Sequence, residues 1–204
     1  MDNKTPQTEF GSNRRVKRAR SIWHEIYEWV DSAVITVMCL LLFLTFVIRQ
    51  VKIDGSSMND TLLHDERVIV SDVFYTPKYG DIVVISSEVY DNVPIIKRVM
   101  AVGGQFIDIK DGKVFVGDSL DQLKAVGSEF VGDIETEAII SDGRYGFYEY
   151  PLEIPEGYVF VLGDNRSVSL DSRATDVGII DERQILGKAV YRVFPFDKIG
   201  GLYD

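Results

Sequence analysis

Two kinds of hydrophobic pattern divide the chain. The first is a single long apolar run, Ala33 to Ile48, whose 16 residues include only Thr36 and Thr45 as mildly polar interruptions. As a helix, at about 1.5 Å per residue, this run measures roughly 24 Å. Counting from Trp29 extends it to about 30 Å, the thickness of the hydrocarbon core of a bilayer. The pattern therefore predicts a membrane helix within residues 21–50.

The flanks of this run favour a retained anchor over a cleavable secretion signal. Trp23, Tyr27 and Trp29 lie at its N-terminal end, where aromatic rings suit the membrane interface. The nearest small-residue tract, 55–57, comes only after several charged residues, whereas signal cleavage normally follows the apolar run closely. A buried helix of a soluble protein is a further alternative, but such a helix rarely follows a basic and aromatic flank.

After the apolar run, the pattern changes to short runs of β-branched and aromatic residues separated by Gly, Asp and Pro, which is typical of strands. These runs predict strands at 67–71, 81–85, 95–102, 106–110, 113–116, 158–162 and 187–193. Asp111-Gly112, between two such runs, predicts a tight hairpin. Helical patterns near 120–124 and 181–186 are weak. Residues 53–204 are therefore expected to form one mainly β domain.

Charge is distributed unevenly along the chain. The 22 basic and 32 acidic residues give a net charge of −10. Residues 1–20 carry six basic and two acidic side chains, or +4, so the rest carries −14. A basic flank predicts a cytoplasmic tail over 1–20 and an exported domain over 53–204. The acidic balance opposes a nucleic-acid partner. The acidic, Gly-containing stretch 126–153 predicts an exposed excursion at about 118–155.

Few side chains are available for a disulfide or a metal site. The single cysteine, Cys39, excludes an internal disulfide framework and a Cys-rich zinc site. The two histidines, His24 and His64, leave little for a His-based metal site. Any chemistry is therefore expected from hydroxyl, amine and carboxylate groups.

A serine in a glycine-flanked turn is the first candidate for chemistry. Ser57 follows Gly55 soon after the apolar run, so it is expected near the membrane surface. Such a turn can expose a hydroxyl and direct backbone N–H groups at a carbonyl, although Gly-Ser-Ser is also an ordinary loop sequence. A serine nucleophile needs a base. His64 is close, but its surroundings are typical of a solvated histidine in a polar turn; His24 is expected across the membrane.

Lys97 is a second candidate base. Strand alternation places it on one face with Ile95 and Val99, an apolar setting that lowers the pKa of an amine. A lysine base needs a pKa near roughly 7–8, against about 10.4 in water. Arg98, on the other face, stays protonated and cannot take that role. The alternative for Lys97 is a side chain that extends its amine to solvent.

The third segment, residues 163–173, contains three Ser, two Asp and two Arg directly after a predicted strand. It is either an Asx-rich loop or a support in which hydroxyls orient a neutral lysine and Asp–Arg pairs stiffen the backbone. Composition alone does not decide between these alternatives.

Together these segments resemble those of bacterial type I signal peptidases, which are membrane-anchored Ser/Lys endopeptidases. The resemblance runs from the apolar run to the C-terminus and rests on the order of short motifs: Gly55-Ser-Ser-Met-x-x-Thr-Leu62, Gly80-Asp-Ile-Val-Val84, Lys97-Arg-Val99, residues 163–173, and Val177-Gly-Ile179 with Gly187. It implies a mainly β catalytic domain, an antiparallel sheet or barrel, after one N-terminal transmembrane helix. It implies no metal or organic cofactor.

The resemblance also implies a role for individual residues. Ser57 matches the nucleophile, and its backbone N–H matches part of the oxyanion hole. Lys97 matches the general base, and Ser169 a hydroxyl that hydrogen-bonds to that lysine. Asp171 and Arg173 match a structural acid–base pair. The implied substrates are exported precursors cut after a small-x-small site, at the extracytoplasmic side of the bacterial cell membrane.

Gly55 stands where some relatives carry a serine that adds a hydroxyl donor, as it does in many Gram-positive-type members of the family. Two departures from the family pattern concern substrate preference. Asp60 replaces the usual Pro, which loosens the turn and adds a carboxylate near the nucleophile. After Lys97-Arg-Val the family has x-Gly-x-Pro-Gly-Asp, and this chain has Met100-Ala-Val-Gly-Gly-Gln105. These departures lead to the hypothesis of a specialised range of precursors.

Three other functions remain open at this point. A signal-peptidase-like assembly factor for exported surface subunits would bind them without cleavage. A Ser/Lys self-cleaving regulator of the repressor type would be cytosolic, which the anchor opposes. A Ser57–His64 hydrolase would lose its activity on His64→Gln, a change that a Ser/Lys enzyme should tolerate. The expected partners are the lipid bilayer and precursors that carry signal peptides.

Overall fold

A computed structural model describes residues 22–47, 49–59, 61–86, 93–132, 134–137 and 148–203. Its internal contacts divide the chain into two units, residues 1–42 and 43–204. Asp60, part of the predicted excursion (residues 133 and 138–147) and the basic tail lie outside the described residues.

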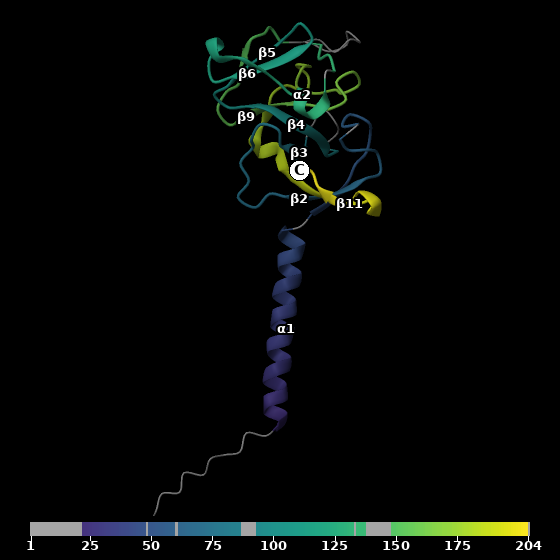
Figure 1. Cartoon of the computed structure of the whole chain (residues 1–204). Helices are drawn as coiled ribbons and strands as arrows, with labels where there is room; N and C mark the ends of the chain where they lie inside the picture. The colour runs from purple at the N-terminus through teal and green to yellow at the C-terminus, as the bar shows by residue number, and fades with distance from the viewer. Residues whose placement is uncertain are drawn as a thin grey trace, which may run out of the picture. The chain divides into compact units, whose positions relative to one another are not determined.

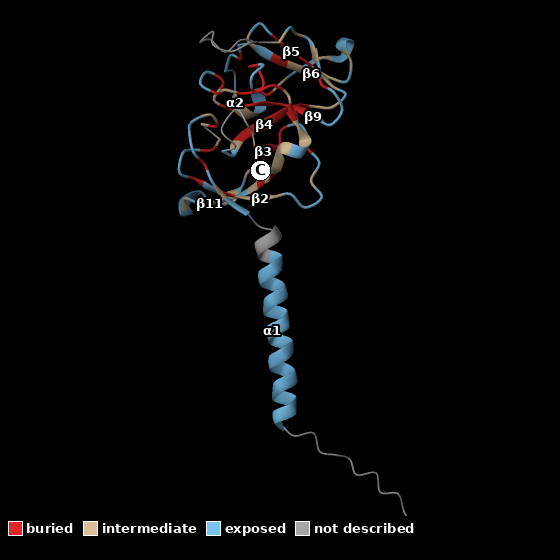
Figure 2. Ribbon diagram, turned by 180° about the vertical axis from the view of Figure 1, so that it is seen from behind, coloured by how far each residue is buried: buried red, intermediate tan, exposed pale blue. Residues whose placement is uncertain are grey.

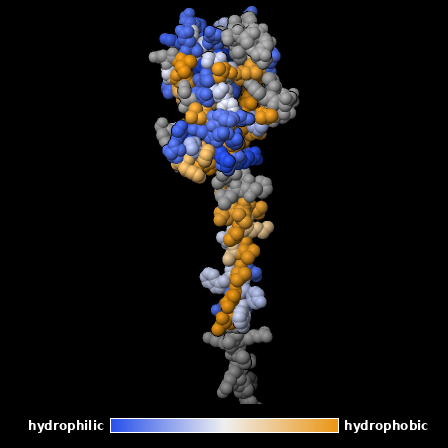
Figure 3. Space-filling model, turned by 90° about the vertical axis from the view of Figure 1, so that its right-hand side faces the viewer, coloured by the Kyte–Doolittle hydropathy of each residue, from blue (hydrophilic) through white to orange (hydrophobic). Residues whose placement is uncertain are grey.

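Helix α1, Ile22–Val47, runs through the predicted membrane span (Figure 1). Its side chains are exposed along the helix up to Phe43, and most of them are hydrophobic (Figures 2 and 3). The segment Ile22–Phe43 is long and apolar enough to cross a membrane, judged by length and composition. An apolar surface of this extent is stable against lipid or another protein rather than in water.

The second unit contains two antiparallel sheets. The larger sheet has the order β1-β2-β11-β3-β4-β9-β10, with β12 paired to β11. Its strands are β1 (Arg49–Lys52), β2 (Arg67–Ser71), β3 (Ile82–Ile85), β4 (Ile95–Val102), β9 (Tyr158–Leu162), β10 (Ile180–Asp181), β11 (Ile185–Phe194) and β12 (Gly200–Gly201). Two 3₁₀ turns, η3 (Glu182–Gln184) and η4 (Phe196–Lys198), flank β11.

The smaller sheet has the order β7-β6-β5-β8 and forms a separate layer, seen at β5 and β6 in Figure 1. Its strands are β5 (Phe106–Lys110), β6 (Lys113–Gly117), β7 (Lys124–Val126) and β8 (Leu152–Glu153); turn η2 (Leu120–Gln122) and the one-turn helix α2 (Ser128–Val131) adjoin β7. Asp111 and Gly112 both have positive φ, 51° and 71°, so the β5–β6 hairpin turns where predicted.

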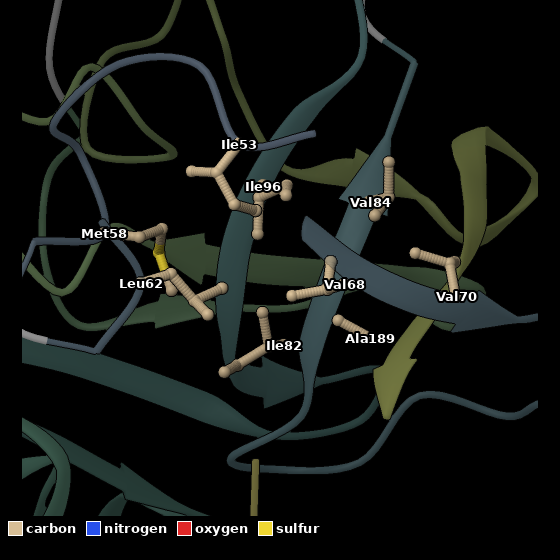
Figure 4. Close-up of a cluster of buried hydrophobic side chains, with 9 residues drawn as sticks. All are labelled: Ile53, Met58, Leu62, Val68, Val70, Ile82, Val84, Ile96 and Ala189. Carbon is tan, nitrogen blue, oxygen red and sulfur yellow. The ribbon is translucent and has the colours of Figure 1, made fainter. Parts of the chain in front are cut away.

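Buried apolar clusters hold the larger sheet together. Strands β3, β4 and β9 are buried almost throughout, as the red segments of Figure 2 show. One cluster lies between the sheet and the chain segment after β1 (Figure 4): Ile53, Met58, Leu62, Val68, Val70, Ile82, Val84, Ile96 and Ala189. Met58 and Leu62 enter this cluster from the turn that carries Ser57, so core packing fixes the position of that turn.

The seven predicted strands are confirmed, with ends within two residues of the prediction. The weak helical patterns form only short 3₁₀ turns and strand residues. The short strands β1, β7, β8, β10 and β12 were not predicted. They have two to four residues, too few to show an alternating pattern, and they form because a neighbouring strand leaves its hydrogen-bonding groups free.

Candidate active site

Ser57 and Lys97 meet, although 40 positions separate them in the sequence. Lys97 Nζ lies 2.9 Å from Ser57 Oγ. Lys97 comes from the middle of β4, and Ser57 comes from the turn after β1. A hydroxyl and an amine in direct hydrogen-bond contact are the arrangement that a serine nucleophile and its base require.

The environment of Lys97 suits a base. Its side chain is only 3 % exposed. Burial disfavours the charged ammonium and lowers the pKa of Lys97 to about 8, and the negative charges of Asp171 and Asp164 oppose that shift. Besides Ser57 Oγ, Nζ contacts the carbonyl oxygen of Ile96 at 3.2 Å. Within the described part of the chain, no carboxylate forms an ion pair with this amine.

Backbone hydrogen bonds hold Ser57 in place from two sides. Within its own turn, the N–H of Leu62 donates to the carbonyl of Met58 at 2.8 Å, and both side chains lie in the core cluster of Figure 4. From the loop after β9, the N–H of Asn165 donates to the carbonyl of Ser57 at 3.0 Å. Ser57 is therefore fixed by its own turn and by the 163–173 segment together.

His64 points elsewhere. Its Nδ1 accepts a hydrogen bond from the N–H of Gly55 at 3.2 Å and lies 3.3 Å from Asp54 Oδ1. The side chain is 57 % exposed. The structure brings Lys97, and not His64, to the hydroxyl of Ser57.

The 163–173 segment is a rigid support. Asp171 and Arg173 form a buried ion pair, with Nε and Oδ1 2.8 Å apart. Asp171 also accepts from the N–H of Gly163 at 3.0 Å. Arg173 Nη2 donates to the carbonyls of Arg166, at 2.7 Å, and Ser169, at 3.1 Å. These bonds tie both ends of the loop together, as the predicted Asp–Arg pairing requires.

Ser169 lies near Gly163 and the carbonyl of Ser57 but is not bonded to Lys97. Its Oγ is buried and has no hydrogen-bond partner among the described residues, so the bond that the resemblance implied is not formed here. The hydroxyl packs against Gly163, where an added methyl group would collide with Ser169 and lie 2.5 Å from the carbonyl oxygen of Ser57. The absence of a side chain at Gly163 therefore leaves just enough room for the Ser169 hydroxyl.

Arg98 and Asp164 form a second buried pair, which the sequence analysis missed. Arg98 Nε and Nη2 lie 2.9 and 2.6 Å from the two carboxylate oxygens of Asp164. Thr61 Oγ1 donates to the same carboxylate at 2.5 Å. An arginine within an apolar strand pattern needs a buried acceptor, and that requirement could have indicated a carboxylate partner.

A small depression adjoins Ser57. It measures about 20 Å³ and is lined by Lys52, Ile53, Asp54, Gly55, Ser57, Met58, Pro94 and Ile96. Since about 10–15 Å³ is needed for one water molecule, this space suits a methyl-sized group. Two larger cavities, of about 480 and 490 Å³, include neither Ser57 nor Lys97.

The fold and this site define a candidate hydrolase, and comparisons with known proteins identify its family. Residues 26–194 match the family described as signal peptidase, peptidase S26. The chain is 32 % identical to signal peptidase I of Bacillus licheniformis over 86 % of this chain and 92 % of the relative. It is 31 % identical to signal peptidase I T of Bacillus subtilis, over 94 % and 97 %.

A third relative, signal peptidase IB of Staphylococcus aureus, is 34 % identical over 85 % of this chain and 92 % of its own. The chain therefore belongs to the signal peptidase family, and it is a peptidase. Family membership and the apolar helix α1 together indicate a membrane-anchored protein.

Proposed function

We propose that this protein removes N-terminal signal peptides from exported precursors, with Ser57 as nucleophile and neutral Lys97 as general base. The observation that carries this proposal is the 2.9 Å contact between Ser57 Oγ and a Lys97 amine that is 3 % exposed. A pKa of about 8 leaves roughly one amine in ten neutral at pH 7, enough to accept a proton.

The reaction proceeds in two proton-balanced stages. First, Ser57 Oγ attacks the scissile carbonyl while its proton passes to Lys97; the C–N bond then breaks and the proton passes to the leaving amine. Second, a water molecule gives a proton to Lys97 and attacks the carbonyl of the acyl-enzyme; the ester C–Oγ bond then breaks, and the proton passes from Lys97 to Ser57 Oγ, which restores the hydroxyl and the neutral amine as the carboxyl product leaves. The oxyanion of each tetrahedral intermediate is stabilised by the backbone N–H of Ser57, and Gly55 adds no side-chain donor.

Ser169 supports the neutral amine in this proposal. A neutral amine has one lone pair and two N–H groups. When the lone pair accepts the proton of Ser57, one N–H can remain on the carbonyl of Ile96, at 3.2 Å in the structure. The second N–H needs an acceptor, and the buried, unpartnered Oγ of Ser169 is the candidate. Asp171 and Arg173 keep the loop that carries this hydroxyl in place.

The depression beside Ser57 supports a preference for small residues before the cut. A space of about 20 Å³ is close to the size of an alanine methyl group. The small-x-small site is therefore the proposed recognition sequence. The basic tail supports a cytoplasmic N-terminus and a catalytic domain on the extracytoplasmic side, where signal-peptide-bearing precursors emerge from the bilayer.

The test is cleavage of a precursor with an Ala-x-Ala site by the full chain in detergent. Wild type, Ser57→Ala and Lys97→Ala run in parallel, and mass spectrometry identifies the products. Cleavage after the small residue by wild type alone supports both the function and the two roles. A folded wild type that cuts no such precursor contradicts the function, and cleavage by Lys97→Ala contradicts the role of the lysine.

The assembly-factor alternative is not favoured. A protein that only binds subunits has no need for a buried amine in contact with a serine hydroxyl, because burying an unpaired cation costs stability. The relatives that cover most of the chain are named as peptidases.

A further inference from the structure

The face of β4 opposite the reactive pair carries an interaction between the two sheets. Arg98, next to Lys97, is 3 % exposed and points away from Ser57. Phe130, from helix α2 beside the smaller sheet, lies over its guanidinium, with Arg98 Cζ 4.1 Å from the ring centroid. A cation on an aromatic face is attracted most strongly when it is shielded from water.

The Phe130 ring is held in a tight fit. A methyl group added at Gly80 would lie 2.8 Å from Phe130 Cζ, so the ring fills the space beside that glycine. The Tyr79 ring lies 5.6 Å from it, centroid to centroid. The Tyr79 hydroxyl donates to the Glu129 carboxylate and accepts from the N–H of Gly127, which anchors the N-terminal end of the turn that carries Phe130.

The Arg98 guanidinium under this ring is paired with the carboxylate of Asp164, which contacts both segments that carry the reactive pair. Asp164 is bound by Arg98, the neighbour of Lys97, and by Thr61, four residues after Ser57. The N–H of Asn165, the next residue, holds the carbonyl of Ser57. A shift of Asp164 would therefore move the nucleophile turn and the strand of the base relative to each other.

We propose that Phe130 is a positioning residue: its ring covers the Arg98–Asp164 pair and thereby keeps Ser57 and Lys97 at bonding distance. Without the ring, water reaches Arg98 and competes for Asp164, because exposed ion pairs are weak and buried ones are rigid. The smaller sheet, which contributes no reactive group, then controls the geometry of the site. This inference rests on the proposed Ser/Lys mechanism.

The test compares Phe130→Ala and Phe130→Leu with Phe130→Tyr, which keeps an aromatic face. Leu120→Ala, an exposed apolar truncation beside the same sheet, is the matched control. We expect kcat to fall about tenfold for Ala and less for Leu, with KM within about twofold, since small displacements of reactive groups cost this much. Phe130→Tyr and Leu120→Ala should stay within about twofold of wild type.

Two further measurements separate positioning from general destabilisation. Exchange of the Arg98 Nε–H with solvent, followed by NMR, should accelerate about tenfold in Phe130→Ala and Phe130→Leu, and remain unchanged in Leu120→Ala. In an Asp164→Asn background, Phe130→Ala should cost less than about twofold in kcat, because the connection is already broken.

Three results would each overturn the positioning role. The first is a wild-type kcat in Phe130→Ala, and the second is an unchanged rate of Arg98 Nε–H exchange in that variant. The third is a loss of kcat on Phe130→Ala that is as large in the Asp164→Asn background as in the wild type. The exchange measurement needs no turnover, so it decides the role of the ring even if the wild type fails to cleave. Failure of wild-type cleavage would instead count against the proposed function.

Discussion

Strand β4 presents two adjacent cations, Lys97 and Arg98, to opposite faces, and both are 3 % exposed. On one face Arg98 has two contacts to Asp164, a third to the carbonyl of Gly80 at 2.8 Å, and a ring over its plane. On the other face, among the described residues, the Lys97 amine has hydrogen-bond contacts only with Ser57 Oγ and the carbonyl of Ile96. Equal burial therefore has opposite consequences: the paired cation is structural, and the poorly compensated amine can lose its proton.

The largest expected effect comes from removing the amine of Lys97, on the face of β4 that meets Ser57. Lys97→Met should lower kcat by about 10³-fold or more, because no other described group replaces the base. The thermal midpoint should stay equal or rise, since a desolvated cation is replaced by a side chain of similar length. Precursor cleavage and thermal unfolding measure the two effects. A Lys97→Met variant that keeps substantial turnover would contradict the mechanism.

The next largest effect is expected on the other face of β4, where Arg98 is paired with Asp164. Arg98→Met leaves the buried Asp164 carboxylate without its ion partner and should cost about 3–5 kcal/mol in the free energy of unfolding. Adding Asp164→Asn should recover part of this loss, because the unpaired charge disappears. Denaturant unfolding of the three proteins provides the comparison. If the single variant is as stable as wild type, the pair is not the structural element described here.

Crowding between the two segments of the site can be tested at Gly163. In Gly163→Ala the new methyl group meets Ser169 and the Ser57 carbonyl, and we expect kcat to fall about 10²-fold. Gly200→Ala is the control, because nothing lies within 4 Å of its added methyl group. The cleavage rates of the two variants are compared. Equal rates would show that the 163–173 segment can move away from Ser57 without loss of activity.

The pH dependence tests the desolvated amine. With a Lys97 pKa of about 8, kcat/KM should rise about tenfold per pH unit below that value and level off above it. The unfolded chain has the higher pKa, 10.5, so burial of the ammonium destabilises the fold fully below about pH 8 and not above about 10.5. The stability advantage of Lys97→Met should therefore shrink as pH rises through that interval.

The smallest effect is expected at His64. His64→Gln should change kcat by less than about twofold, since an amide oxygen can replace Nδ1 as the acceptor for the N–H of Gly55. The same precursor assay measures it. A loss of 10²-fold or more would favour the Ser–His hydrolase and contradict the assignment of the base to Lys97.

Local patterns predicted much of this protein because they act over short distances. The α1 segment was evident from a long apolar run, and the main strands from short runs of β-branched and aromatic residues. The motifs around Ser57 and Lys97 identified the candidate residues. Short edge strands such as β1 and β8 carry no such pattern, since they depend on a partner that the sequence places far away.

By itself the sequence determined the anchor, the mainly β domain and the residue types available for chemistry, because periodicity and composition are local properties. Only the tertiary structure decided that Ser57 meets Lys97 rather than His64, and that Arg98 is neutralised by Asp164 under the ring of Phe130. Desolvation and ion pairing depend on atoms within a few ångströms in space. In this site those atoms come from residues 40 to 103 positions apart in the sequence.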